Sequence, residues 1–62
     1  MRRYYFTFVT SARRVLHSLH GKFDDDQQAV IFARGILDAA EPPVVAVEAW
    51  ERSRLVCRVQ RN

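Results

Sequence analysis

The chain has 62 residues and a net charge of +3, carried by nine arginines, one lysine and seven carboxylates. A chain this short forms one domain, residues 1–62, and buries only about 60% of its unfolded surface. Its single cysteine excludes an internal disulfide, and one cysteine with two histidines disfavours a structural zinc. Because no apolar run approaches the ~20 residues of a membrane span and no signal peptide is visible, we expect a cytoplasmic protein with no membrane partner.

The chain opens with an aromatic and β-branched segment, residues 3–10, that predicts a strand. Its larger and more apolar set of alternating side chains should face a core: Tyr4, Phe6 and Phe8. A turn without Gly or Asn follows at residues 11–14. Residues 15–20 predict a second strand, and their alternation leaves open which side faces inward.

Residues 25–40 are the segment with a sustained helical period. One apolar stripe follows the spacing of an amphipathic helix: Ala29, Phe32, Ala33, Ile36, Leu37 and Ala40. Asp24 is the predicted N-cap, and Pro42 ends the helix because it pushes the preceding residue out of the α region. Ile31 and Gly35 lie opposite the stripe, either as ordinary surface or as a second contact with another chain.

Two further strands are predicted after the helix, at residues 44–51 and 55–60. Glu48 would be costly to bury unpaired, so the side chains alternating with it should face inward: Val45, Val47 and Ala49. In the last strand we expect the inward set to be Leu55, Cys57 and Val59. The order predicts an α+β fold of ββαββ type, a two-layer sandwich with one helix on one face of a four-stranded, mainly antiparallel sheet.

Several stretches of the chain resemble small uncharacterised alphaproteobacterial proteins of ββαββ type, a domain family of unknown function. They are the arginine-rich aromatic opening at residues 2–6, the helix at residues 25–35, and the V-E-x-W and R-L-V stretches at residues 47–50 and 54–56. The family usually has Gly in both hairpin turns, whereas residues 11–14 and 51–54 contain none. The resemblance implies the same fold and brings no established function.

A single helix covers only one face of a four-stranded sheet, which is about 19 Å wide at ~4.8 Å per strand. The uncovered face should be rich in aromatic and β-branched side chains, and such a patch usually marks an interaction site. We expect it to carry Tyr5, Thr7, Val9, Glu48, Trp50, Val56 and Arg58.

The simplest function of this face is contact with another protein, above all a second copy in a twofold homodimer. The alternative is a nucleic-acid-binding module in which Tyr5 and Trp50 stack bases and arginines hold phosphates. The basic residues are predicted to divide between the two ends of the sheet, with only Arg58 and Arg54 near the aromatic side chains. This distribution favours the homodimer.

No catalytic, metal or cofactor site is predicted, and we do not expect an enzyme. His17 and His20 are three residues apart on a strand, which sends them to opposite faces. Cys57 alternates with apolar residues and has the pattern of a small buried hydrophobe. The three adjacent carboxylates at residues 24–26 have the pattern of cap and dipole residues at a helix start.

Overall fold

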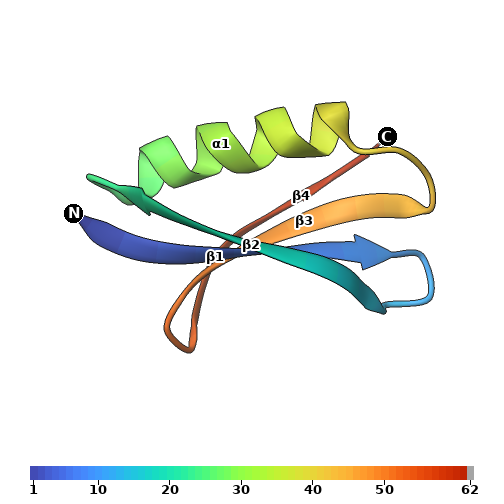
Figure 1. Ribbon diagram of the computed structural model, residues 1–62, viewed down its shortest axis with the longest axis horizontal. Helices are drawn as coiled ribbons and strands as arrows, with labels where there is room; N and C mark the ends of the chain where they lie inside the picture. Colours follow the sequence, from blue (N-terminus) through green and yellow to red (C-terminus); the bar gives the residue numbers. More distant parts are fainter. Residues whose placement is uncertain (62) are drawn as a thin grey trace.

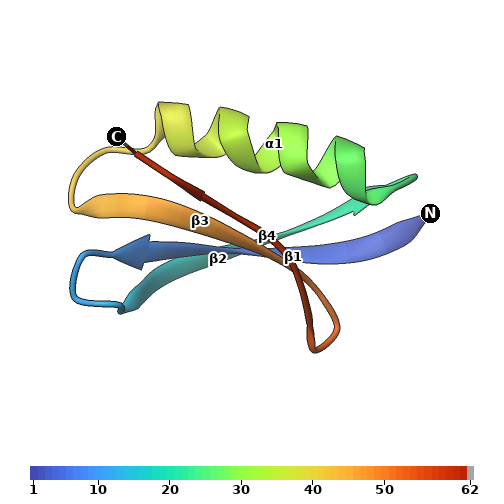
Figure 2. The ribbon, with the colours of Figure 1, turned by 180° about the vertical axis from the view of Figure 1, so that it is seen from behind.

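The computed structural model describes residues 1–61. Its elements are β1 (Arg2–Thr10), β2 (Val15–Phe23), α1 (Asp26–Ala39), β3 (Val44–Glu51) and β4 (Arg54–Gln60). The strands form one antiparallel sheet in the order β2-β1-β3-β4, with α1 on one face, chiefly over β3 and β4 (Figure 1). The ββαββ α+β fold is therefore confirmed, and the view from behind shows the same two layers (Figure 2).

The helix begins one residue later than predicted. Asp25 is the N-cap, and its carboxylate accepts a hydrogen bond from the Gln28 N–H at 2.9 Å. The Gln28 side chain in turn accepts from the Asp24 N–H at 3.1 Å, so two free donors at the helix start are satisfied. The predicted apolar stripe is confirmed: Ala29, Ala33 and Leu37 are buried, and Phe32, Ile36 and Ala40 pack against the core.

An aromatic cluster fills the space between the sheet and the first half of α1. Tyr4 and Phe6 are fully buried, and the rings of Phe23 and Phe32 lie 5.9 and 4.9 Å from that of Phe6. The packing of Phe23 in this cluster was not predicted from the sequence, because β2 runs three residues beyond its predicted end. Gly21 makes room for it, since a Cβ there would lie 2.8 Å from the Phe23 ring. The absence of a side chain at Gly21 thus allows the Phe23 ring to pack on Phe6.

Each of the three strand pairings contains one irregularity, and those on β3 and β4 change which of the predicted side chains face the helix. Near the start of β3, Val44 belongs to the core in place of Val45, which is only partly buried. In β4 the pairing shifts between Ala49 and Trp50, so Leu55 pairs with Trp50 and is 46% exposed. Val56 packs against the core instead. The predicted sides of Leu55 and Val56 were wrong, because one extra residue in a strand reverses the alternation beyond it.

A cluster of charged side chains ties the start of β1, the β3–β4 turn and the start of α1 together. Arg2 donates to both carboxylate oxygens of Glu51 at 2.7 and 2.6 Å. Arg54 donates to Glu51 at 2.6 Å and to both oxygens of Asp26 at 3.2 and 3.1 Å. The buried Tyr4 hydroxyl donates to Asp26 at 2.8 Å. Asp26 is therefore a tertiary anchor as well as a residue that complements the helix dipole.

The same cluster shifts the acidity of its members. Hydrogen bonds from Arg2 and Arg54 lower the pKa of Glu51 to about 2. The hydrogen bond from Arg54, supported by that from Tyr4, lowers the pKa of Asp26. Burial, and then the bond to Asp26, raises the pKa of the Tyr4 phenol. Both carboxylates are thus held ionised by the folded structure.

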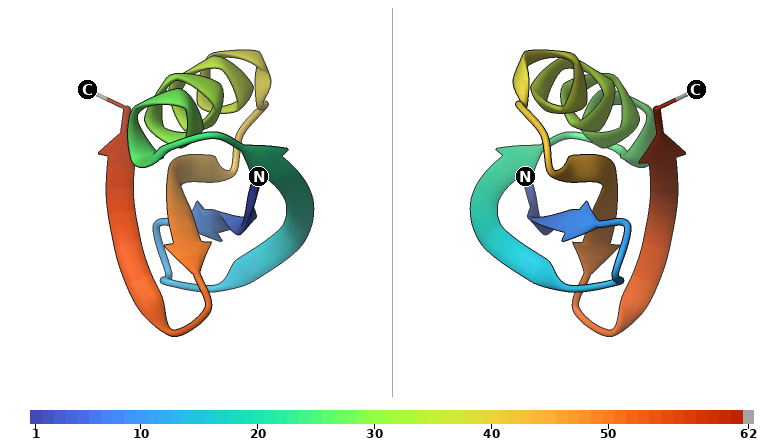
Figure 3. Two further views of the ribbon diagram at one scale, coloured as in Figure 1. Left: turned by 90° about the vertical axis from the view of Figure 1, so that its left-hand side faces the viewer. Right: turned by 90° about the vertical axis from the view of Figure 1, so that its right-hand side faces the viewer.

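The other end of the helix is closed by Arg61. Its guanidinium donates to the carbonyl oxygens of Leu37 at 2.8 Å, of Ala40, and of Val44 at 3.1 Å. A cation at this position satisfies free carbonyls and complements the negative end of the helix dipole. End-on views show the last parts of β2 and β4 rising on either side of α1 (Figure 3). The sheet therefore curves around the helix and leaves its other face uncovered.

Candidate functional site

The face of the sheet turned away from α1, called the open face below, is defined by strand pairing, because paired residues share a side. Tyr5 pairs with His20 on β2 and with Trp50 on β3. Thr7 pairs with Glu48, and Glu48 with Arg58. Five of the seven side chains predicted for this surface therefore lie together on it: Tyr5, Thr7, Glu48, Trp50 and Arg58.

The other two predicted members have different positions. Val9 lies opposite Ala46, and the two are only 4% and 0% exposed, so they form the floor of the open face rather than its surface. Val56 packs on the helix side and is not part of the surface. Leu55, beside Trp50, takes its place as the exposed apolar residue of β4.

The centre of the open face is aromatic. Tyr5 and Trp50 stand on the two central strands, directly opposite each other, and both are partly exposed. The Tyr5 ring meets the His20 ring edge to face, with centroids 4.5 Å apart, which fixes its orientation. Flat rings held in place on central strands can stack against planar groups of a ligand.

Basic side chains surround this aromatic centre. Arg3 and Lys22 pair with each other at one end of the open face. Arg52 in the β3–β4 turn lines a hollow of about 450 Å³ with Arg3 and Tyr5. The basic residues do divide between the two ends of the sheet, but the expectation that only Arg58 and Arg54 lie near the aromatic side chains was wrong, because Arg3 and Arg52 line a hollow with Tyr5. Arg54, expected near them, belongs instead to the cluster with Asp26 and Glu51.

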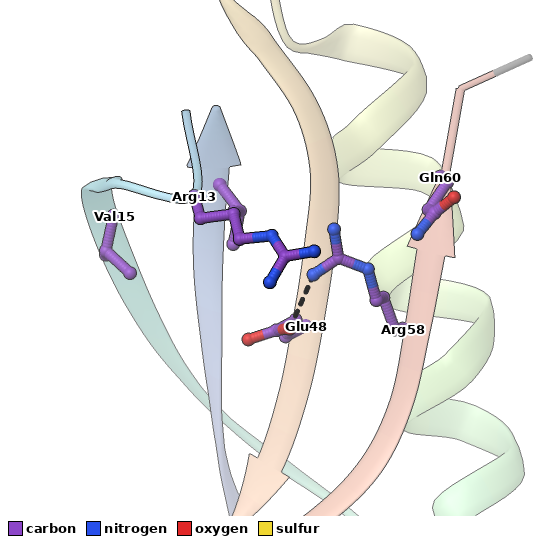
Figure 4. Close-up of a pocket in the computed structure, with 6 residues that line it drawn as sticks. Arg13, Val15, Glu48, Arg58 and Gln60 are labelled. Atoms are coloured by element: carbon purple, nitrogen blue, oxygen red, sulfur yellow. Dashed lines mark hydrogen bonds and ion pairs between the residues drawn. The ribbon is translucent and has the colours of Figure 1, made fainter. Parts of the chain in front are cut away.

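A second hollow, of about 340 Å³, lies at the opposite end of the open face. Its lining consists of Val9, Arg13, Val15, Glu48, Arg58 and Gln60. Arg58 donates to the Glu48 carboxylate at 2.6 Å, and the Arg13 guanidinium points toward that of Arg58 above this ion pair (Figure 4). We call it the Arg13–Arg58 hollow.

Thr10 positions Arg13 through the β1–β2 turn. The Thr10 hydroxyl oxygen accepts from the N–H groups of Ala12 and Arg14 at 3.2 and 3.3 Å. The Arg13 N–H donates to the Thr10 carbonyl at 2.9 Å, and Arg13 has a positive φ of 62°. A buried threonine thus organises a turn that has no glycine, and the turn directs the arginine over the open face.

The residues missed by the sequence analysis differ in how visible they were. Arg3 shares the parity of Tyr5 and could have been placed on the open face by alternation alone. Lys22 was lost when the second strand was ended too early. Arg13 had no signal, because a turn residue has no strand parity.

The remaining reactive side chains have structural surroundings. His17 pairs with Phe8 on the helix side whereas His20 lies on the open face, which confirms that the two histidines point apart. Cys57 packs against the core, and burial raises the pKa of its thiol. Within residues 1–61, no three His, Cys, Asp or Glu side chains are grouped as metal ligands would be. No helix in that range has the length and apolar character needed to cross a membrane.

Comparison with known proteins adds no relative: no family model, no curated protein and no solved structure matches the chain. The resemblance to small alphaproteobacterial proteins stays a prediction. The case for a function therefore rests on the open face.

Proposed function

We propose that the protein binds single-stranded nucleic acid on the open face, in a non-enzymatic role. The supporting observation is the segregation of charge between the two sides of the molecule. The open face and its rim have five basic side chains: Arg3, Arg13, Lys22, Arg52 and Arg58. They outnumber the two carboxylates that line its hollows, Glu48 and Glu51, and Glu51 is already paired with Arg2 and Arg54. A surface with this excess of positive charge attracts a polyanion.

The side of the helix has the opposite character. Four exposed carboxylates gather at its start and end, Asp24, Asp25, Asp38 and Glu41, against one exposed arginine on α1, Arg34. Asp24 and Asp25 repel phosphate from the helix N-terminus, which would otherwise attract anions. The two sides therefore differ in sign, and the proposal assigns the polyanion to the open face.

The chemistry of the open face suits a single strand in particular. Tyr5 and Trp50 on adjacent central strands can stack successive unpaired bases, as aromatic side chains do in other sheet-based RNA binders. Stacking contributes about 1–3 kcal/mol per base and tolerates any sequence. The basic groups at both ends can contact the backbone on either side of the stacked bases. The proposal includes a cytoplasmic location, as expected from the sequence, where single-stranded nucleic acid is present.

Binding of a fluorescently labelled dT12 oligonucleotide, followed by anisotropy from 25 to 200 mM salt, tests the proposal. With four phosphate contacts, the slope of log K against log salt should be about −3, since each contact to a single strand contributes about −0.7. Trp50→Ala should weaken binding about five- to hundredfold through the loss of one stacking partner.

Ile31→Ala is the matched control, because Ile31 is 65% exposed on the outer side of α1. It should leave the affinity unchanged, and circular dichroism should show that both variants remain folded. Absence of binding at 25 mM salt, or binding that does not respond to salt, would refute the proposal.

A second candidate is self-association through the same face, which the exposed apolar group around Trp50 and Leu55 favours. Stacking two open faces about a twofold axis would bring the basic groups of both copies together. Like charges across an interface are costly, typically by several kcal/mol. The charge on the open face therefore supports nucleic acid over a second copy.

A further inference from the structure

We propose that the Arg13–Arg58 hollow is a phosphodiester-binding site. This inference rests on the proposed function and gives it a defined backbone contact, on the far side of the aromatic centre from Arg3 and Lys22. Its lining comes from all four strands and from the β1–β2 turn, which meet only in the folded chain.

The hydrogen-bond donors of the hollow are largely unused. Arg58 donates through a single nitrogen to Glu48, although a guanidinium has five N–H donors. Within residues 1–61, the Arg13 side chain has no hydrogen-bond or ion-pair partner. The Gln60 side chain stands on the same wall as Arg58 (Figure 4). The hollow thus has several N–H groups available for one acceptor.

The approach of two guanidinium groups also has an electrostatic consequence. Arg13 and Arg58 point toward each other, and like charges repel unless an anion lies between them (Figure 4). Glu48 compensates only one of the two positive charges, so the hollow retains a net charge of about +1. A phosphodiester has one negative charge and neutralises that remainder.

Geometry favours phosphate over other anions. The planar fork of arginine binds phosphate oxygens in pairs, and two forks approaching from different elements suit a tetrahedral group. Val9 and Val15 provide an apolar wall against which a sugar can pack. The site therefore matches an internal phosphate of a strand that continues toward Trp50.

Arg13→Gln is the informative variant, because it removes one fork without leaving Glu48 unpaired, as a change at Arg58 would. Arg14→Gln is its matched control: it makes the same charge change one residue away in the same turn, outside the hollow. Arg13→Gln should weaken dT12 binding about five- to tenfold and reduce the magnitude of the salt slope by about 0.7. Arg14→Gln should change the affinity less than twofold.

A second measurement follows the Nε–Hε NMR signals of the arginines during titration with dT12 and, separately, with inorganic phosphate. Selective shifts of the Arg13 and Arg58 signals support the site. Equal losses of affinity in the two variants, with dT12 still bound by the wild type, would overturn the phosphodiester site and leave the proposed function intact.

If dT12 does not bind the wild type, the proposed function fails, and the titration with inorganic phosphate decides the fate of the hollow. Selective shifts of Arg13 and Arg58 would then support a phosphate site that serves a ligand other than a nucleic-acid strand. Unchanged signals would overturn the site as well.

Discussion

At the scale of single residues, each hairpin turn contains one residue whose backbone adopts the left-handed conformation that glycine normally occupies. Arg13 has φ 62° and Arg52 has φ 57°. The left-handed region costs an L-residue about 1–2 kcal/mol. Thr10 compensates in the first turn by accepting two backbone hydrogen bonds. The second turn has only two residues between paired strand ends, Arg52 and Ser53.

A comparison of Arg52→Gly with Arg52→Ala isolates this strain, since both variants remove the same side chain. We expect the glycine variant to be more stable by about 1 kcal/mol, because only glycine adopts positive φ without a Cβ clash. In a domain of this size the difference corresponds to about 4–8 °C in Tm. Thermal unfolding followed by circular dichroism measures it.

Ser53 provides the control, since it does not have positive φ. Ser53→Gly should be less stable than Ser53→Ala, because glycine there gains only unfolded-state freedom. The same order at both positions would contradict the assigned turn geometry. The two residues with positive φ, Arg13 and Arg52, could not be identified from the sequence, because both turns lack the glycine or asparagine that usually marks this conformation.

At the scale of elements, the charged cluster joins β1, the β3–β4 hairpin and α1 at one end of the molecule. Its members come from residues 2, 4, 26, 51 and 54, and nothing in the local sequence around any of them indicates the contact. Strand parity predicts which face a residue occupies but not which distant residue it meets. That is why the sequence analysis assigned Asp26 only a local role at the helix start.

Stability should depend on pH through this cluster. The pKa of Glu51 is about 2 in the folded protein, below the ordinary value of 4.5 for a glutamate, so between these two values protons bind preferentially to the unfolded chain. The stabilisation by Glu51 is complete above about pH 4.5 and is lost as the pH falls toward 2. Thermal unfolding between pH 2 and 7 should show a declining Tm over that range.

Glu51→Gln should have a lower Tm at pH 7 and a shallower decline at acid pH, since one of the shifted carboxylates is absent. Glu41→Gln, an exposed position after the helix, is the matched control and should follow the wild type. An identical acid profile for Glu51→Gln and the wild type would show that Glu51 does not couple folding to protons.

At the scale of the whole molecule, the proposed function predicts a monomer. Light scattering after size-exclusion chromatography at low salt should give a mass near 7.2 kDa, because the basic groups on the open face repel those of a second copy. A mass near twice that value, lost in Trp50→Ala, would favour self-association and count against nucleic acid as the partner of this face.

The architecture was predictable because the hydrophobic periods of the first strand and of the helix are clear: Tyr4 and Phe6 alternate along a strand, and Ala29, Ala33 and Leu37 repeat along a helix. The order of the strands was not, since it depends on which edges meet in space. The bulge in β4 that turns Val56 toward the helix in place of Leu55 could not be predicted either, because the sequence does not indicate which residue of a strand is left unpaired. The candidate site was predicted in its aromatic centre and at Arg58, whereas the positions of Arg3, Arg13, Lys22 and Arg52 beside it were missed.

The separation of charge between the two sides limits how many strands one molecule can engage. A second polyanion would have to approach the helix side, where the carboxylates are exposed. A protein molecule bound to one nucleic-acid strand therefore repels other nucleic-acid strands with its helix side. If the proposed function holds, each copy of the protein binds one nucleic-acid strand and keeps it apart from other nucleic-acid strands. Proteins that are basic all round act in the opposite way, bridging strands and condensing them into a network.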